Sequence, residues 1–260
     1  MIHRTLDLRS EPIIKPESFY GKHEKIADIC VITFSYRVIE WAIARLDCHK
    51  VAEIGCINGN HPIYLTTIQG VKIAFYMTLV SSSGTATCLE EANCFTGAEE
   101  FILFGSCGSL DYELTKGKVI VPTQAYRDEG LSYHYQEASE YIDIVNSDKL
   151  AELLKQMQVP YVQGKVWTTD ALYRETKNKA GQLREEGCIA VEMELAGAQA
   201  VCNFHGWELY NFLLTGDSLE GERWSAEVLG SEEEVDLQIC YFQLALKVAV
   251  NLVGQENTVM

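Results

Sequence analysis

Apolar residues along this chain are gathered into short, nearly continuous runs that are bounded by glycine, proline and polar residues. Runs of about four to eight such residues are typical of strands that are buried on both faces of a sheet. Two of the runs flank Gln69-Gly70, a pair that is typical of a hairpin turn. The predicted strands cover residues 29–34, 63–68, 71–79, 101–105, 118–126, 164–170, 189–194 and 207–217.

Helical spacing of apolar residues occurs between these runs. Ser231 and Glu234 form a capping box that predicts the start of a last helix. Polar residues at 238, 243, 247 and 251 share one stripe of that helix, so we expect it to be amphipathic and packed on the protein, not to span a membrane. The predicted helices cover residues 36–46, the later part of 81–95, and residues 147–157, 174–186, 195–206 and 235–253.

Strands that alternate with helices predict an α/β fold around a mostly buried central sheet. No internal repeat, low-complexity segment or linker rich in Gly, Pro and Ser divides the chain. We therefore expect a single domain of residues 1–260. Residues 1–25 are polar and contain Pro12 and Pro16, which predicts an extended N-terminal arm.

The charge and the cysteines narrow the class of protein. The chain of 260 residues carries 21 Lys and Arg against 37 Asp and Glu, so its formal net charge is −16. A nucleic-acid partner would need a basic face, which argues against one. The nine cysteines are irregularly spaced without a C-x-x-C pair. Together with an N-terminus that lacks the apolar core of a signal peptide, they favour a reducing, cytoplasmic setting.

Polar stretches follow several predicted strands at the point where each strand ends, and ligands of α/β sheets gather at such ends. The stretch TFSYR (33–37) offers backbone N–H groups and Arg37 to an oxyanion at a helix start. The stretch VSSSGT (80–85) offers hydroxyls to an anion or a sugar. Taken alone, the first stretch is more typical of an ordinary strand–helix turn, and the second is more typical of a serine N-cap with a loop.

The stretch FILFGSCGS (101–109) interrupts an apolar strand with Gly105 and Gly108. Two glycines three residues apart allow a ligand to approach the backbone closely, and the hydroxyl of Ser106 can donate a hydrogen bond. A tight turn out of a buried strand would use the same residues. We expect the strand to end at Gly105 and a loop to follow.

Glu192 and Glu194 lie two residues apart around Met193 in an apolar stretch, VEMELAGA. In an extended strand these two carboxylates would share a face, where burial is unfavourable unless a ligand satisfies them. A vicinal diol would do so, because each hydroxyl donates a charge-assisted hydrogen bond. The alternative is a helix start with acidic first-turn residues. We favour the binding role.

Asp217 ends another apolar strand, in LLTGDS. Apolar neighbours raise the pKa of a carboxyl group, which suits a general acid. An Asx turn is the alternative.

The ordered motifs FGSCGSL, GKVIVP, TTD, VEMELAGAQAV and LTGDS resemble the nucleoside phosphorylase-I family over about residues 28–253. The family contains purine nucleoside phosphorylases, uridine phosphorylases and adenosylhomocysteine/methylthioadenosine nucleosidases. The resemblance implies a three-layer α/β/α domain with a central mixed, partly barrel-like sheet. It also implies a cytoplasmic homodimer or homohexamer that cleaves a purine nucleoside to free base and ribose 1-phosphate, with inorganic phosphate as co-substrate and no metal or other cofactor.

The resemblance also implies roles for individual residues. Asp217 would protonate the purine ring as it leaves, and His3 would reach from the arm into a neighbouring subunit's site. The expected ribose-binding residues are Glu192, Met193, Glu194 and His3. The expected phosphate-binding residues are Arg37, Ser106, Thr33 and Gly105. The expected base-binding residues are Cys107, Gly108 and Leu172.

The sequence departs from the family pattern at the phosphate site. Leu103 stands where the phosphorylases have an arginine, and the first loop begins with Thr33 where they have a glycine. The arginine of the adjacent subunit falls near GNHP (59–62), where His61 could substitute in part. Uridine phosphorylases carry a Gln and an Arg that read uracil, and neither occurs around Thr176 and Asn178, so the retained Asp217 favours a purine or a related base over uracil.

These departures leave alternatives. A nucleosidase would not need the missing arginines, yet the nucleosidases have a glutamate in the first loop, and Glu40 lies too far along the helix. Arg37 is the phosphorylase-like feature of that loop. We expect phosphorolysis, with hydrolysis, uridine phosphorolysis and a nucleoside-binding homologue without turnover as alternatives.

Overall fold

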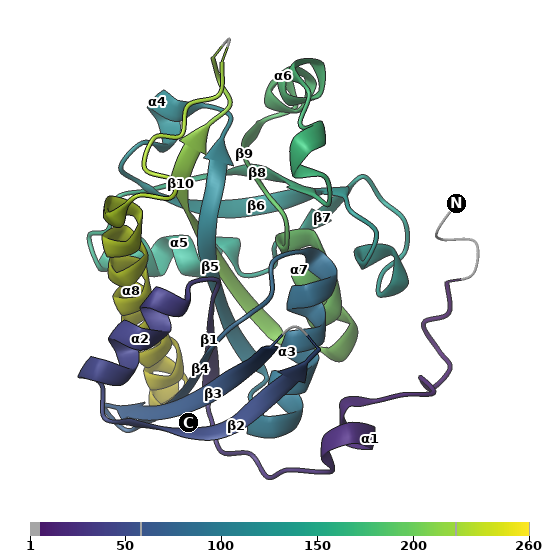
Figure 1. The fold of residues 1–260 in the computed structure, drawn as a ribbon, viewed down its shortest axis with the longest axis vertical. Helices are drawn as coiled ribbons and strands as arrows, with labels where there is room; N and C mark the ends of the chain where they lie inside the picture. The colour runs from purple at the N-terminus through teal and green to yellow at the C-terminus, as the bar shows by residue number, and fades with distance from the viewer. Residues whose placement is uncertain (1–5, 58, 222, 260) are drawn as a thin grey trace.

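A mixed sheet forms the centre of the molecule in this computed structural model, which describes residues 6–57, 59–221 and 223–259. Its strands are β1 (Ile29–Thr33), β2 (Cys48–Cys56), β3 (Gly59–Ile68), β4 (Val71–Met77), β5 (Glu100–Ser109), β6 (Val119–Asp128), β7 (Tyr141–Asp143), β8 (Tyr161–Thr169), β9 (Cys188–Glu192) and β10 (Glu208–Ser218). They are ordered β10-β6-β8-β9-β5-β1-β4-β3-β2, and β7 pairs with β6 (Figure 1).

Part of this sheet closes into a barrel. Strand β10 pairs in parallel with β5 along most of its length, and it also meets β6 in antiparallel pairing at Leu213 and Ile120. Strands β5, β9, β8, β6 and β10 therefore form a closed ring. Strands β1 to β4 continue from β5 as an open extension, in which β3 and β4 form the predicted hairpin. The prediction of a mixed, partly barrel-like sheet is confirmed.

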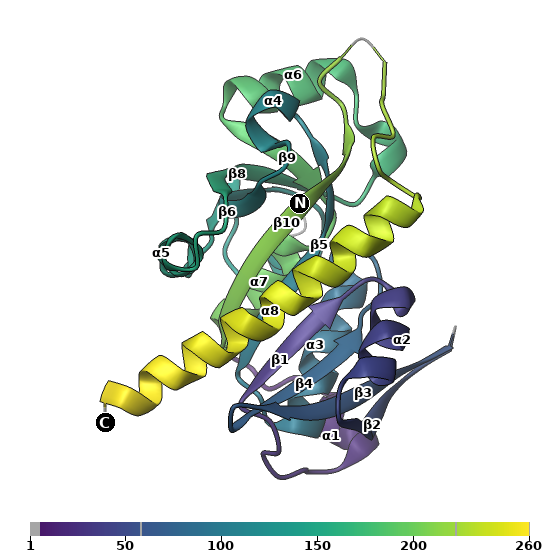
Figure 2. The same cartoon turned by 90° about the vertical axis from the view of Figure 1, so that its left-hand side faces the viewer.

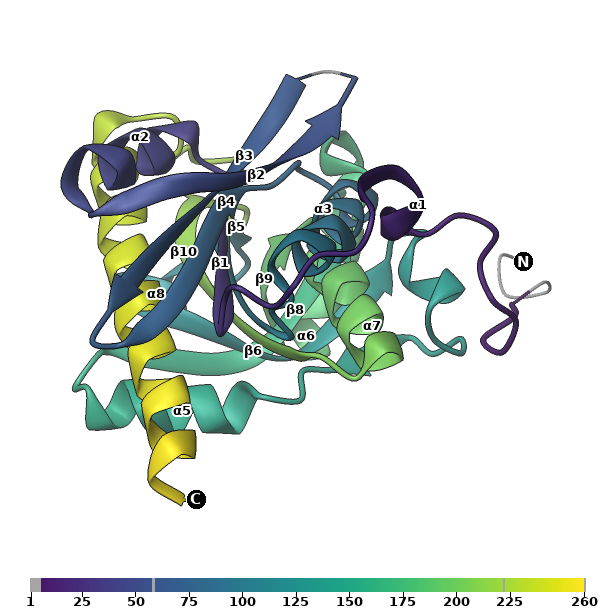
Figure 3. The same cartoon turned by 90° about the horizontal axis from the view of Figure 1, so that it is seen from below.

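Helices cover both faces of the sheet. They are α1 (Pro16–Tyr20), α2 (Tyr36–Arg45), α3 (Ser82–Thr96), α4 (Tyr112–Thr115), α5 (Ser147–Gln156), α6 (Lys177–Glu185), α7 (Leu195–His205) and α8 (Glu232–Val259), with 3₁₀ helices η2 (Ser132–His134) and η3 (Leu172–Arg174). Helices α3 and α7 pack into one apolar core, and α2, α5 and α8 pack into a second core on the opposite face (Figure 3). The predicted three-layer α/β/α arrangement is confirmed.

Helix α8 crosses the open face of the sheet obliquely (Figure 2). Its segment Glu232–Gly254 is long and apolar enough to span a membrane by composition. In the fold, however, Phe242, Ala245 and Ala249 are fully buried against the sheet. The predicted amphipathic, packed helix is confirmed, and its first turn reaches the end of β5, where the site described below lies.

The prediction that the first glycine ends strand β5 is wrong. The strand continues to Ser109, because β10 pairs with it through Cys107 and Gly108 and β9 pairs with it from Gly108 onward. The glycines serve close packing and not a turn. A Cβ atom at Gly105 would lie 2.8 Å from the ring of Phe34, and one at Gly108 would lie 2.4 Å from Leu219.

Smaller differences between the predicted and observed elements occur in segments whose hydrophobic pattern is weak. Strands β2 and β7 were not predicted, and β2 has only one buried residue, Ile54, so its apolar residues do not alternate cleanly. The N-terminal arm contains the short helix α1, and the helix predicted from residue 174 begins at Lys177, after η3. All nine cysteines are free and six of them are buried, as expected for cysteines that act as small apolar residues.

Candidate active site

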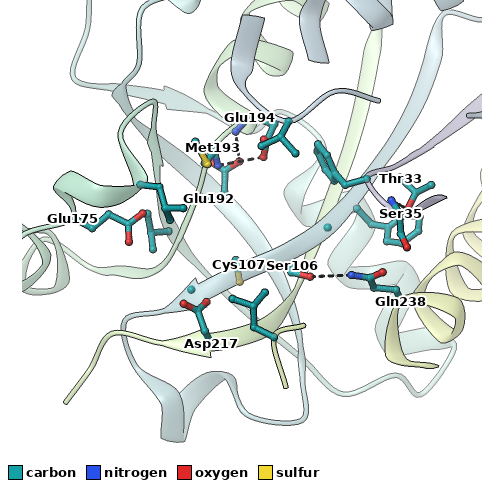
Figure 4. Close-up of a pocket in the computed structure, with 18 of the residues that line it drawn as sticks. Thr33, Ser35, Ser106, Cys107, Glu175, Glu192, Met193, Glu194, Asp217 and Gln238 are labelled. Carbon is teal, nitrogen blue, oxygen red and sulfur yellow. Dashed lines mark hydrogen bonds between the residues drawn. The ribbon is translucent and has the colours of Figure 1, made fainter. Parts of the chain in front are cut away.

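A cavity of about 270 Å³ lies where β1 and β9 end, beside the second halves of β5 and β10 (Figure 4). Apolar side chains such as Phe34, Phe104 and Val191 form part of its lining. Polar side chains are grouped around it in three places. The carboxylate edge comprises Glu192, Met193 and Glu194; the Asp217 end comprises Cys107, Glu175 and Asp217; the Ser106 end comprises Thr33, Ser35, Ser106 and Gln238.

At the carboxylate edge, the chain turns from strand to helix within three residues. Strand β9 ends at Glu192, and Glu194 is the N-cap of α7 with φ −132° and ψ −35°. The prediction that both residues lie on one face of an extended strand is therefore wrong. Both carboxylates nevertheless line the same cavity, because the tight strand-to-helix turn brings them side by side.

Backbone donors hold both carboxylates. Oε2 of Glu192 accepts hydrogen bonds from the N–H groups of Glu194 and Leu195, at 2.7 Å each, and Thr168 donates its hydroxyl to Oε1. Oε1 of Glu194 accepts from the N–H of Ser81 at 2.8 Å, and Oε2 accepts from the N–H of Met193 at 3.2 Å. Each Glu194 oxygen keeps a lone pair for a further donor.

The two glutamates are nearly buried, with 6% and 8% of Glu192 and Glu194 exposed. Burial raises the pKa of both carboxyl groups, and the negative charge of Glu192 raises the pKa of Glu194 further. A ligand that donates hydroxyl hydrogen bonds, or that carries positive charge, would offset this burial. The edge is thus suited to a diol next to a centre of positive charge.

At the Asp217 end, a second pair of carboxyl groups faces the cavity. Asp217 follows an irregularity in the pairing of β10 with β5, and the indole Nε1 of Trp224 donates to its Oδ2 at 2.5 Å. Burial raises the pKa of Asp217. Burial and the charge of Asp217 together raise the pKa of Glu175 to about 7. This end can therefore deliver a proton near neutral pH.

At the Ser106 end, a carboxylate from α8 lies directly behind the wall of the cavity. The hydroxyl of Ser106 donates to Oε1 of Glu234 at 2.6 Å, and Gln238 donates to the same oxygen at 3.1 Å. The N–H of Gly230 donates to Oε2 of Glu234 at 2.6 Å. Ser231 accepts from the N–H of Glu234 at 3.1 Å, which confirms that half of the predicted capping box.

The structure brings most of the predicted site residues together. The predicted residues that line the cavity are Thr33, Gly105, Ser106, Cys107, Gly108, Leu172, Glu192, Met193, Glu194 and Asp217. Arg37 is not among the lining residues: its guanidinium pairs with Glu232 at 3.0 Å, and its side chain is 41% exposed. His3 lies outside the described residues, so its prediction stays untested.

Several residues of the site, Glu175 and Glu234 among them, were missed by sequence reasoning. Glu175 was predicted to lie in the helix of residues 174–186, but it lies between η3 and α6 and lines the cavity, a position that nothing in the sequence marks. Glu234 was noted only as part of a capping box, and the carboxylate instead reaches Ser106, which lies 128 residues earlier in the chain. Only the folded position of α8 reveals this contact.

The charges around the cavity are of one sign. No lysine or arginine is among the cavity-lining residues that the structure describes. Leu103 is buried in the core of β5, and the ring of His61 bonds the carbonyl of Met77 at 2.9 Å. No group of three or more His, Cys, Asp or Glu side chains within residues 6–57, 59–221 and 223–259 is arranged to hold a metal ion. The cavity therefore favours a ligand that is neutral or develops positive charge.

Comparison with known proteins agrees with this architecture. The sequence model of the phosphorylase superfamily matches residues 28–241. The guanosine phosphorylase of Halorubrum lacusprofundi is 26% identical over 189 residues, which cover 72% of this chain and 70% of that protein.

Solved structures show the same fold. The purine nucleoside phosphorylase of Toxoplasma gondii in complex with immucillin-H superposes with a TM-score of 0.71 at 20% identity, covering 89% of this chain and 93% of that one. A futalosine hydrolase mutant of Helicobacter pylori superposes with a TM-score of 0.65 at 16% identity, covering 87% and 99%. At identities of 20% and 16%, these two similarities show a shared fold only.

Proposed function

The chain belongs to the phosphorylase superfamily, and we propose that it is an enzyme that cleaves the N-glycosidic bond of a purine nucleoside. The observation that carries this proposal is the arrangement of carboxyl groups at separate places around one apolar cavity. The carboxylate edge suits the sugar, and the Asp217 end suits the base. The bond between sugar and base would then lie between these two places.

The sugar is held, in this proposal, by Glu194 and Met193. A vicinal diol can donate to the remaining lone pairs of Glu194, whose orientation is fixed by Ser81 and Met193. As the bond to the base breaks, the sugar ring gains positive charge. Two buried carboxylates, with no lysine or arginine among the described residues of the cavity lining, stabilise that charge more strongly than they stabilise the neutral substrate, which is the condition for catalysis.

The base leaves as an anion unless it is protonated. Asp217 lies at the opposite end of the cavity with a raised pKa, so it can hold a proton and give it to a ring nitrogen. A purine has such a nitrogen, N7, in the same five-membered ring as the nitrogen of the bond that breaks. The names of the relatives, guanosine phosphorylase among them, also support a purine.

The names of the relatives and the lining of the cavity favour different acceptors for the sugar. The relatives' names support inorganic phosphate, with ribose 1-phosphate as product. Water is the second candidate, and the Ser106 end favours it because a carboxylate occupies the position behind Ser106 and no lysine or arginine is among the described residues that line the cavity.

The experiment is a base-release assay on the purified protein with guanosine, inosine, adenosine and uridine, each in phosphate and in a phosphate-free buffer. We expect a purine nucleoside to be cleaved and uridine to be spared. Asp217→Asn should lower the rate about a hundredfold, because a general acid contributes roughly 10²- to 10⁴-fold. Asp236→Asn, at an exposed position on α8, is the matched control and should be unchanged.

Two results would contradict the proposal. Cleavage of uridine alone would remove the assignment of the base. Absence of cleavage in both buffers, with nucleosides still raising the melting temperature, would show a binding protein without turnover.

A further inference from the structure

The hydroxyl of Ser106 is turned away from the cavity it lines. Its proton is donated to Oε1 of Glu234 at 2.6 Å, and the side-chain amide of Gln238 donates to the hydroxyl oxygen at 3.4 Å. A serine hydroxyl has one proton and two lone pairs. Ser106 therefore presents a lone pair to the cavity, so it accepts hydrogen bonds there and donates none.

Glu234 is fixed in this position by its surroundings. It is 7% exposed, and its second oxygen accepts from the N–H of Gly230 at 2.6 Å. Gln238, one turn later on α8, donates to the first oxygen at 3.1 Å. The contact with Ser106 thus belongs to a network of several hydrogen bonds and is not a chance approach of a surface side chain.

The Ser106 end of the cavity is a poor binding site for an anion. Phosphate needs donors and positive charge, whereas Ser106 offers a lone pair and Glu234 a negative charge behind it. Arg37, two residues after the cavity-lining Ser35, is held by Glu232 at 3.0 Å and is not among the described residues that line the cavity. A water molecule fits the same position, because its O–H can donate to Ser106.

From this geometry, and resting on the proposed glycosidic cleavage, we infer that the acceptor is water, which Ser106 binds and from which a proton passes through Ser106 to Glu234. Ser106 touches the attacking water, so it is a catalytic residue. Glu234 acts through Ser106 and is a positioning residue that also stores the proton.

The step balances without a further reactant. The water oxygen forms a bond to the anomeric carbon as the bond from that carbon to the base nitrogen breaks. The electron pair of the broken bond stays on the base, which takes a proton from Asp217. The attacking water gives a proton to the oxygen of Ser106, whose own proton moves to Glu234. The products are free base and free ribose, and solvent returns the proton from Glu234 to Asp217.

The test identifies the sugar product. Purified protein is incubated with guanosine, inosine or adenosine, with and without inorganic phosphate, and ribose and ribose 1-phosphate are quantified separately. We expect free ribose in both conditions at equal rates. Ribose 1-phosphate that forms only with phosphate would overturn the water inference while leaving glycosidic cleavage intact. No sugar product from any of the nucleosides would overturn both.

Variants test the two residues. Ser106→Ala and Glu234→Gln should each lower kcat about a hundredfold with little change in KM, because the loss concerns the attacking water and not nucleoside binding. The double variant should lose no more than either single one, since the two residues act as one unit. Glu233→Gln, at the exposed neighbouring position, is the matched control and should be unchanged.

Other outcomes would contradict the assignment. Multiplicative losses in the double variant would mean that Ser106 and Glu234 act separately. A rise in KM without a fall in kcat would mean that they bind the nucleoside. Thermal melts of each variant distinguish these results from a loss of folded protein.

Discussion

The carboxylate edge and the Ser106 end belong to one cavity but are built differently. At the carboxylate edge, the groups that hold Glu192 and Glu194 are mostly backbone N–H groups from the same strand–helix turn and from Ser81. At the Ser106 end, a side chain on β5 depends on a side chain from the distant helix α8. The first arrangement is local in sequence except for the contacts from Ser81 and Thr168, whereas the second joins side chains that lie 128 residues apart.

This difference has a consequence for function. Both places present acceptors and negative charge, so the whole cavity favours a sugar that becomes positively charged. A phosphorylase needs hydrogen-bond donors and positive charge at one of these two places, because its co-substrate is an anion. The electrostatic contrast expected between a sugar site and a phosphate site is thus missing among the described residues.

The largest effect is expected at the carboxylate edge. Glu194→Gln should lower kcat/KM at least a hundredfold, because two hydroxyl hydrogen bonds to a charged acceptor are weakened, each worth about 1.5–3 kcal/mol. Steady-state kinetics with the nucleoside that proves to be the best substrate measures this. Glu185→Gln, at an exposed position, is the control. Unchanged kinetics would remove Glu194 from the sugar site.

The main carboxyl groups of the carboxylate edge and of the Asp217 end could be predicted from the sequence, whereas little of the Ser106 end could. Glu192, Glu194 and Asp217 stand out because charged residues seldom interrupt apolar strands. Ser106 was found between two glycines, but those glycines were mistaken for a loop, because a strand that lacks side chains where neighbours pack closely resembles a turn. Glu234 looked like a helix cap, since a contact over 128 residues leaves no local pattern.

An intermediate effect is expected from Glu175, at the Asp217 end. Its pKa of about 7 in the folded protein exceeds the value of roughly 4.3 in an unfolded chain. Stability is therefore lost as the pH rises from the unfolded value through the folded one, and the loss is complete above about pH 7. Glu175→Gln should raise the melting temperature at pH 8 and change it much less at pH 4.5.

Thermal melts across this pH range test the prediction. An equal shift at both pH values would mean that the charge of Glu175 does not oppose folding. A lower melting temperature at pH 8 would mean that the carboxylate is stabilised by a partner. Either result would remove Glu175 from the group of buried carboxyl groups that favours positive charge in the cavity.

The smallest effect is expected from Arg37, although the family resemblance assigns it to phosphate. Its ion pair with Glu232 is exposed and screened by solvent, so it contributes little to stability. Arg37→Ala should change the cleavage rate less than twofold, with or without phosphate. A tenfold or larger loss that appears only in phosphate would show that Arg37 turns into the site and that the Ser106 end does bind the anion.

The most direct test of the contrast between the two places is the initial rate of purine nucleoside cleavage as a function of phosphate concentration, starting from a phosphate-free buffer. If water bound at the Ser106 end is the acceptor of the sugar, we expect the full rate without phosphate and no change of the rate with phosphate concentration. A rate that falls to zero as phosphate is removed would contradict it and would identify the enzyme as a phosphorylase.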